Sequence, residues 1–138
     1  MKQFKAILLL FICCSFLLAS CTITSTKIKQ PIFGDKSKAQ KELNNLVSAE
    51  NFNLSGKEVT QNNNSSSELE ISITNGQNIP TGDIERKALG KSIASIIKRN
   101  LSNQDEYDKY TVLFITKNET GNATKRTWVG DVFSSSEL

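Results

Sequence analysis

The segment ELEISITNGQNIPTGDIERKALGKSIASIIKRNL, residues 68–101, decides the fold. Apolar and polar residues alternate over residues 68–74, which is the pattern of a strand with one buried face. The turn-forming residues Asn75-Gly76 and Pro80-Thr81-Gly82 then interrupt the chain. Helical spacing begins at residue 83 and predicts a helix to residue 101. Its core-facing stripe consists of Leu89, Ile93, Ile96, Ile97 and Leu101.

Two further patterns precede this segment. Residues 36–49 follow Asp35, a suitable N-cap, and their apolar residues lie on one helical face. Residues 52–59 alternate as a strand does, with a bulge expected at Gly56, and a polar loop is expected over residues 61–67.

Two strands follow the segment. Residues 110–116 (YTVLFIT) are apolar on both faces, as in a central strand. Residues 117–122 are expected to form a loop that leads into a last strand over residues 124–133. The element order is then α-β-β-α-β-β. It predicts an α+β two-layer sandwich, with a four-stranded, mainly antiparallel sheet and two helices, in one domain of residues 35–138.

Composition excludes several classes of site. The chain has no histidine, and its three cysteines are Cys13, Cys14 and Cys21, so neither a zinc site of Cys and His nor a Ser-His-Asp or Cys-His nucleophile is possible. The chain has 17 Lys and Arg against 14 Asp and Glu, and loss of Lys2 and Lys5 with a leader would leave 15 against 14. This near-balance argues against nucleic-acid binding, which needs a strongly basic surface.

The first 20 residues have the pattern of a signal peptide. Lys2 and Lys5 precede the apolar stretch AILLLFICCSFLLA, residues 6–19, which falls short of the roughly 20 residues that cross a bilayer as a helix. The end of the leader and the residue after it read Leu18-Ala19-Ser20-Cys21. This ending resembles the lipobox of bacterial lipoproteins, in which small residues precede a cysteine.

The resemblance covers residues 1–21 and implies lipid attachment at Cys21. In lipoproteins, a diacylglyceryl group joins this thiol, signal peptidase II cuts before it, and the new amino terminus is often acylated with a palmitate-type chain. Leu18, Ala19 and Ser20 would be the peptidase recognition residues. The alternative is an ordinary secreted protein in which Cys21 has no such role.

The same resemblance carries expectations about location. Thr22 stands where an Asp would resemble an inner-membrane retention signal, which favours the outer membrane. No acidic run of the kind that resembles a surface-export tag follows Cys21, which favours the periplasmic side. Residues 21–34 lack periodicity and contain Pro31 and Gly34, so they are expected to form a lipidated tether. The thirteen residues after Cys21 would reach at most ~45 Å when extended.

Two motifs suggest ligands without meeting their requirements. Gly90-Lys91-Ser92 mimics the end of a phosphate-binding loop, but Glu85 stands where the loop needs its first glycine. Asp105, Glu106 and Asp108 lack the glycine and distal glutamate of a calcium-binding loop. The sequence therefore predicts no nucleotide, no metal and no other cofactor.

Aromatic and basic residues near the C-terminal strands are the candidates for recognition. Trp128, Tyr110 and Arg126 would form a recognition patch if exposed, whereas core packing is the commoner use of such aromatic residues. The prediction is a non-enzymatic binding or envelope-assembly module with a protein or glycan partner. The alternatives are a small carboxylate-based hydrolase of envelope glycans and an inhibitor or immunity-type lipoprotein.

Overall fold

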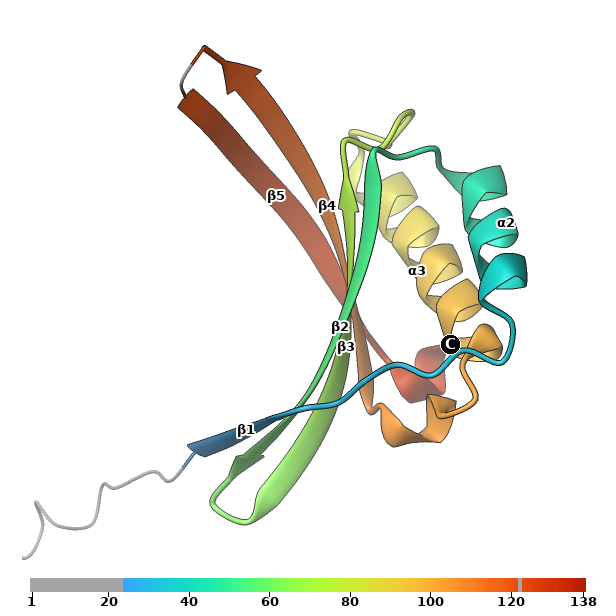
Figure 1. Ribbon diagram of the computed structural model, residues 1–138, viewed down its shortest axis with the longest axis vertical. Coiled ribbons are helices and arrows are strands. Elements are labelled where there is room, and N and C mark those ends of the chain that lie inside the picture. Colours follow the sequence, from blue (N-terminus) through green and yellow to red (C-terminus); the bar gives the residue numbers. More distant parts are fainter. Residues whose placement is uncertain (1–23, 122) are drawn as a thin grey trace, which may run out of the picture.

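The computed structural model describes residues 24–121 and 123–138. The signal peptide, its recognition residues Leu18, Ala19 and Ser20, and Cys21 lie outside these ranges. Helices α2 (Lys36–Leu46) and α3 (Asp83–Asn100) lie side by side and cover one face of a sheet (Figure 1). The sheet contains β1 (Thr24–Ile28), β2 (Asn51–Gln61), β3 (Asn64–Thr74), β4 (Lys109–Thr120) and β5 (Ala123–Ser134), and the short 3₁₀ helices η1 (Gln104–Glu106) and η2 (Ser135–Glu137) adjoin it.

The α+β class is confirmed, but the expected four-stranded, mainly antiparallel sheet is wrong. The sheet has five strands in the order β1-β2-β3-β4-β5 and is mixed. The pairs β1–β2, β2–β3 and β4–β5 are antiparallel, whereas β3 and β4 are parallel. The parallel pair arises because α3 connects the two strands and returns the chain to the same end of the sheet.

The fifth strand lies in the segment that was expected to be a tether. Residues 24–28 pair with residues 57–61 of β2, and the Lys29 N–H donates to the Gly56 carbonyl at 2.8 Å. Every residue of β1 is exposed. The ladder of backbone hydrogen bonds, rather than burial of side chains, therefore holds this segment in place.

The predicted polar loop over residues 61–67 is also wrong, because β2 and β3 form a tight hairpin there. Asn62 and Asn63 have φ values of 49° and 66°, the left-handed pair of a two-residue hairpin turn. The β2–β3 register runs without interruption from Asn51 to Gln61, so the expected bulge at Gly56 is absent. An added Cβ at Gly56 would lie 2.1 Å from the Lys29 carbonyl oxygen, which shows that a glycine is needed there for close contact.

The core lies between the helices and one face of the sheet. Leu69, Ile71 and Ile73 of β3 are fully buried, as their alternation predicts. The α3 stripe is buried against them through Ile93, Ile96 and Ile97, and Asp35 caps α2 by accepting the Lys38 N–H at 2.9 Å. Gly90 faces Phe133, with an added Cβ at 3.4 Å from the ring, so it is a packing residue of α3.

The β4–β5 hairpin extends beyond the helical layer (Figure 1). The expected loop over residues 117–122 is shorter, because β4 continues to Thr120 and β5 begins at Ala123, with Gly121 at φ 58° in the turn. Residues 123–130 of β5 are all exposed. This hairpin presents side chains to solvent on a regular, hydrogen-bonded framework.

Candidate functional site

The helices leave the second face of the sheet uncovered (Figure 1). On this face, Ile115 of β4 pairs with Trp128 of β5, and Leu113 pairs with Gly130. The buried Val112 and Phe133 lie on the opposite, helix-facing side, as strand alternation requires. We call Leu113, Ile115, Trp128 and Val132 the open-face patch.

The open-face patch is apolar and accessible. Trp128 is 73% exposed and Val132 is 58% exposed. An added Cβ at Gly130 would lie 2.4 Å from Leu113 Cδ2, so the Leu113 side chain lies across the glycine. The lack of a side chain at Gly130 therefore leaves a shallow apolar surface between Trp128 and Val132.

The structure brings two of the three predicted recognition residues to this face. Arg126 lies two residues before Trp128 on β5 and is exposed on the same face. Tyr110 does not join them. It is fully buried on the helix-facing side, where its hydroxyl donates to the Gln104 carbonyl at 3.2 Å, and burial raises the pKa of Tyr110 to about 12. The inclusion of Tyr110 in the patch is therefore wrong.

The other half of the uncovered face is polar. The Thr111 hydroxyl donates to the Glu68 carboxylate at 2.5 Å, and Lys57 approaches the same carboxylate at 3.2 Å. Partial burial would raise the pKa of Glu68, but the Thr111 hydrogen bond and Lys57 together hold it below its ordinary value. The apolar patch is thus bordered by a charged strip on β2 and β3.

A second candidate site is a groove between α2, β2 and the chain that enters α2. It has a volume of about 670 Å³ and is open to solvent. We call it the edge groove. Its wall includes Ile32, Phe33, Lys36, Leu43, Phe52 and Leu54.

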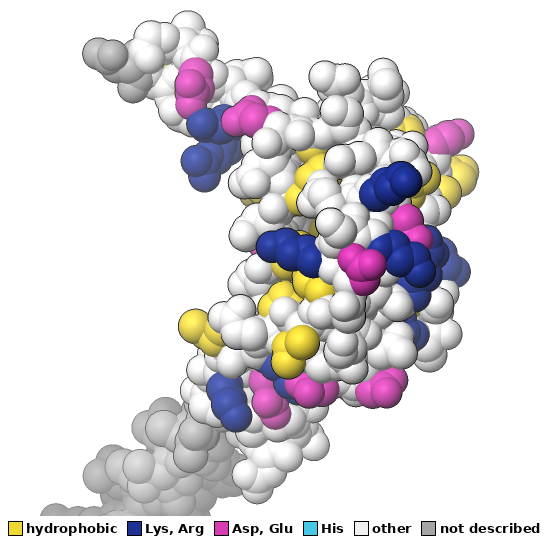
Figure 2. Space-filling view, turned by 45° about the vertical axis from the view of Figure 1, so that its right-hand side comes forward, with side chains coloured by type: hydrophobic (Ala, Val, Ile, Leu, Met, Phe, Trp, Pro, Cys, Tyr) yellow, Lys and Arg dark blue, Asp and Glu magenta, His cyan; other side chains and the backbone are white. Residues whose placement is uncertain are grey.

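The surroundings of the edge groove combine apolar and charged side chains. Figure 2 shows hydrophobic side chains gathered in the concave middle of the molecule, with charged side chains spread over the helical side. Within the described ranges, Lys36 is the only charged residue in the groove wall. Paired carboxylates of the kind that a glycan hydrolase uses do not line it within those ranges.

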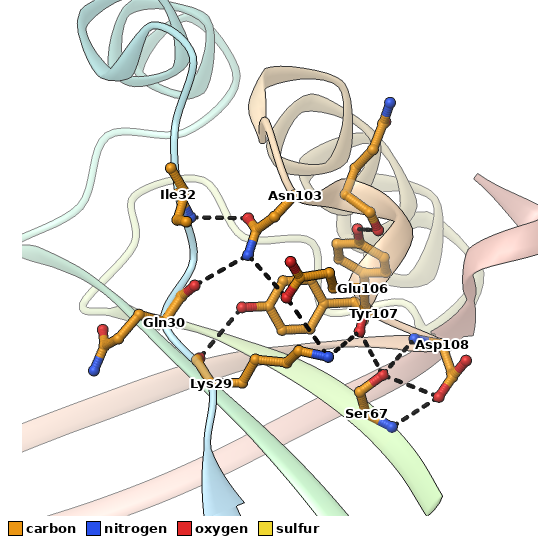
Figure 3. Close-up of polar contacts among 10 residues, drawn as sticks. Lys29, Gln30, Ile32, Ser67, Asn103, Glu106, Tyr107 and Asp108 are labelled. Atoms are coloured by element: carbon orange, nitrogen blue, oxygen red, sulfur yellow. Dashed lines mark hydrogen bonds and ion pairs between the residues drawn. The ribbon is translucent and has the colours of Figure 1, made fainter.

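Asn103 positions the chain that forms one wall of the edge groove (Figure 3). Its side-chain amide donates to the Gln30 carbonyl at 3.1 Å and accepts the Ile32 N–H at 2.9 Å. The Ser102 N–H donates to the Ile32 carbonyl at 2.7 Å, and Phe33 forms a bridge with Leu101. The chain after β1 is therefore fastened to the end of α3.

A second group of polar contacts lies beside Asn103 (Figure 3). The Lys29 ammonium donates to the Glu106 carbonyl at 3.0 Å and lies 5.8 Å from the centre of the Tyr107 ring. The Asp108 carboxylate accepts the Ser67 N–H at 2.8 Å and the Ser67 hydroxyl at 3.0 Å. These hydrogen bonds from Ser67 hold the pKa of Asp108 below its ordinary value. The Lys29 ammonium also lies 3.6 Å from the Glu106 carboxylate, so the carboxylates of Glu106 and Asp108 both form contacts within the molecule.

Sequence reasoning missed the edge groove. The signal that was available is Pro31, which has no N–H and therefore cannot continue a strand ladder in the segment expected to be a tether. No sequence pattern identifies Asn103 as the residue that holds this segment.

Comparison with known proteins adds little. No protein-family profile matches the chain, and no curated protein matches it significantly. A crystal structure of the sex pheromone staph-cAM373 precursor superposes with a TM-score of 0.48 and 11% sequence identity, over 83% of this chain and 40% of that one. This chain thus spans less than half of that protein's chain, and a likeness this distant carries no functional argument. No helix within residues 24–121 and 123–138 is long and apolar enough to cross a membrane.

Proposed function

We propose that this chain is a lipoprotein of the bacterial cell envelope, anchored through Cys21, that binds a protein or glycan partner without catalysing a reaction. The observation that carries the binding role is Trp128, which is 73% exposed beside Val132 on the uncovered sheet face. A large aromatic side chain on a rigid strand gives contact area at low entropic cost, and tryptophan is enriched among residues that dominate binding energy. Arg126 supplies a charged group at the edge of the same surface.

The short distance in sequence between Cys21 and β1 supports an arrangement in which the domain lies close to the membrane. β1 begins at Thr24, three residues after Cys21, and three residues reach at most about 11 Å. Because β1 is part of the sheet, the lipid would hold the domain against the bilayer instead of on the long tether that the sequence suggested. The β4–β5 hairpin, at the opposite end of the molecule in Figure 1, would then point away from the lipid. The proposed location is the outer membrane, facing the periplasm.

The anchor can be tested by metabolic labelling with a fatty-acid probe. Wild-type protein should be labelled, and Cys21→Ser should not. Cys13→Ser is the matched control, because this cysteine lies in the leader and its loss should leave the label unchanged. Equal labelling of wild type and Cys21→Ser would contradict the lipid anchor.

The binding role can be tested by photo-crosslinking in intact cells. A photoreactive aromatic residue, which keeps a ring at position 128, replaces Trp128 in one variant and Ile84 in another. Ile84 is likewise an exposed apolar side chain, 82% exposed, on the helical layer. A discrete crosslinked partner at position 128 and none at position 84 is expected. Identical products from both positions, or hydrolysis of a cell-wall glycan by the purified protein, would contradict the proposal.

A further inference from the structure

Half of one sheet edge is open. β1 pairs with β2 only at residues 57–61, and the last backbone hydrogen bond between this segment and β2 runs from the Lys29 N–H to the Gly56 carbonyl. Backbone groups of alternate residues in a strand point to the same edge. Leu54 and Phe52, two and four residues before Gly56, therefore present their N–H and C=O groups to the side that β1 has left.

Defined contacts keep this edge open. Pro31 has no N–H to donate to a ladder, and Asn103 binds the backbone on both sides of it. The Gly34 N–H then donates to the Asn100 carbonyl at 3.0 Å, so the chain follows the end of α3 instead of β2. The chain after Lys29, which could otherwise pair with this edge, is therefore bound to the end of α3 and to Asn103.

The open edge borders the edge groove directly. Phe52 and Leu54 are half-buried and contribute their side chains to the groove wall. Across the groove lie Leu43 of α2 and Phe33. A strand added to β2 would project alternate side chains toward this apolar wall, at a spacing of about 7 Å. Backbone hydrogen-bonding groups and side-chain space therefore occur together.

The open edge also lacks the residues that usually prevent pairing with another strand. Residues 51–55 (NFNLS) contain neither proline nor a charged residue, the common means by which proteins block pairing at an exposed edge. Lys36 is the only charge that the described residues place in the groove wall. The surface therefore favours an extended chain that carries apolar side chains and one acidic group.

We propose that an extended polypeptide segment, apolar at alternate positions and with an acidic group beside Lys36, adds to the sheet along Asn51–Ser55 and fills the edge groove. The added strand continues the ladder that β1 forms with the other half of β2. Peptide backbone is the occupant because it supplies both the donors and the acceptors that Phe52 and Leu54 need, which a fatty acid cannot. This surface is separate from the open-face patch, and the proposal depends neither on that patch nor on the lipid.

The test uses a displayed library of nine-residue peptides, selected on the purified full chain. Selected peptides should share alternating apolar residues with an acidic residue, and N-methylation of the backbone at alternate positions should weaken binding about tenfold or more. In hydrogen exchange, the Phe52 and Leu54 amides should exchange quickly in the free protein and slowly in the complex. Protection of β5 amides instead, or binding that is insensitive to N-methylation, would overturn the proposal.

Charge reversal supplies the matched pair of variants. Lys36→Glu should weaken binding of the acidic peptides about tenfold, whereas Lys38→Glu, on the same helix but outside the groove wall, should leave it within twofold. Both variants change the net charge equally, and both side chains are exposed. An equal effect of the two would show that the peptide does not lie in the groove. Failure of this test would leave crosslinking at Trp128 unaffected, so the two proposals can fail separately.

Discussion

The side-chain oxygen of Asn103 accepts the backbone N–H of Ile32 at 2.9 Å, although 71 residues separate the two in sequence. The side-chain nitrogen of Asn103 donates to Gln30 on the other side of Pro31. One side chain thereby satisfies a backbone donor and a backbone acceptor in a segment that has left the sheet.

Asn103→Ala should lower the free energy of unfolding by about 1–3 kcal/mol, because it removes two hydrogen bonds to backbone groups. Asn103→Asp keeps the acceptor for Ile32 but puts a carboxylate oxygen against the Gln30 carbonyl oxygen. The same oxygen would face the Glu106 carboxylate, 3.4 Å from the present amide nitrogen, so at neutral pH this variant should be no more stable than the alanine variant. Urea denaturation measures both effects. If the alanine variant is as stable as wild type, Asn103 does not hold the segment.

Alanine substitutions at two glycines should change the free energy of unfolding in opposite directions. Gly130→Ala places a Cβ 2.8 Å from the Val112 carbonyl oxygen as well as against Leu113, and this overpacking should cost about 1–3 kcal/mol. In Gly90→Ala the added Cβ makes ordinary contacts, 3.4 Å from the Phe133 ring and 3.8 Å from Val112 Cβ. Alanine favours the helix by up to about 1 kcal/mol, so this variant should be as stable as wild type or more stable. Thermal unfolding of the two variants distinguishes them. Destabilisation by Gly90→Ala would show that α3 leaves no room for a methyl group against Phe133 of β5.

Acid should weaken the contact between Ser67 and Asp108. The folded state lowers the pKa of Asp108, so this group stabilises the fold above its unfolded pKa, near 3.8, and the contribution is lost as pH falls through the folded pKa. Between pH 6 and pH 2, the stability of Asp108→Asn should therefore fall less steeply than that of wild type. Ser67→Ala is the matched variant, because it removes the hydroxyl donor and keeps the N–H donor to Asp108, and its profile should lie between those of Asp108→Asn and wild type. Parallel profiles for wild type and Asp108→Asn would contradict this role of Asp108.

Trp128 is the only tryptophan, so fluorescence excited selectively in tryptophan reports on the open-face patch alone. The free protein should emit as a solvent-exposed indole does, and binding of a partner should shift the emission to shorter wavelength. Trp128→Ser should change the unfolding free energy by only about 0.5 kcal/mol, because the side chain is mostly exposed, while abolishing partner capture. A large loss of stability in this variant would indicate a packing role for Trp128 instead.

The sequence predicts the elements that bury apolar side chains. Alternation at residues 68–74 and the helical stripe of α3 are both confirmed, because burial imposes a period on the sequence. β1 imposes no such period, since all five of its residues are exposed and its pairing uses only backbone groups. The polar run at residues 61–67 likewise has no apolar period, so its pattern does not indicate a hairpin. Its consecutive asparagines were nevertheless a usable turn signal.

The candidate site was only partly predictable. In residues 110–116 both faces are apolar, so alternation cannot tell which side meets the helices. The grouping of Tyr110 with Trp128 rests on their nearness in sequence, but the β4–β5 register pairs Tyr110 with Phe133 and places Trp128 opposite Ile115. The register between β4 and β5, which depends on the hairpin turn, determines which side chains form the patch. No local sequence pattern predicts that register.

The parallel pairing of β3 with β4 constrains how this chain can fold. β2 with β3, and β4 with β5, are hairpins whose partners are close in sequence, so each can form early from local contacts. Their union requires closure of a loop that includes all of α3, which costs more chain entropy than either hairpin turn. The rate-limiting step of folding should therefore be the docking of two preformed hairpins on α3, and substitutions at the β3–β4 seam should slow refolding more than substitutions at either hairpin tip.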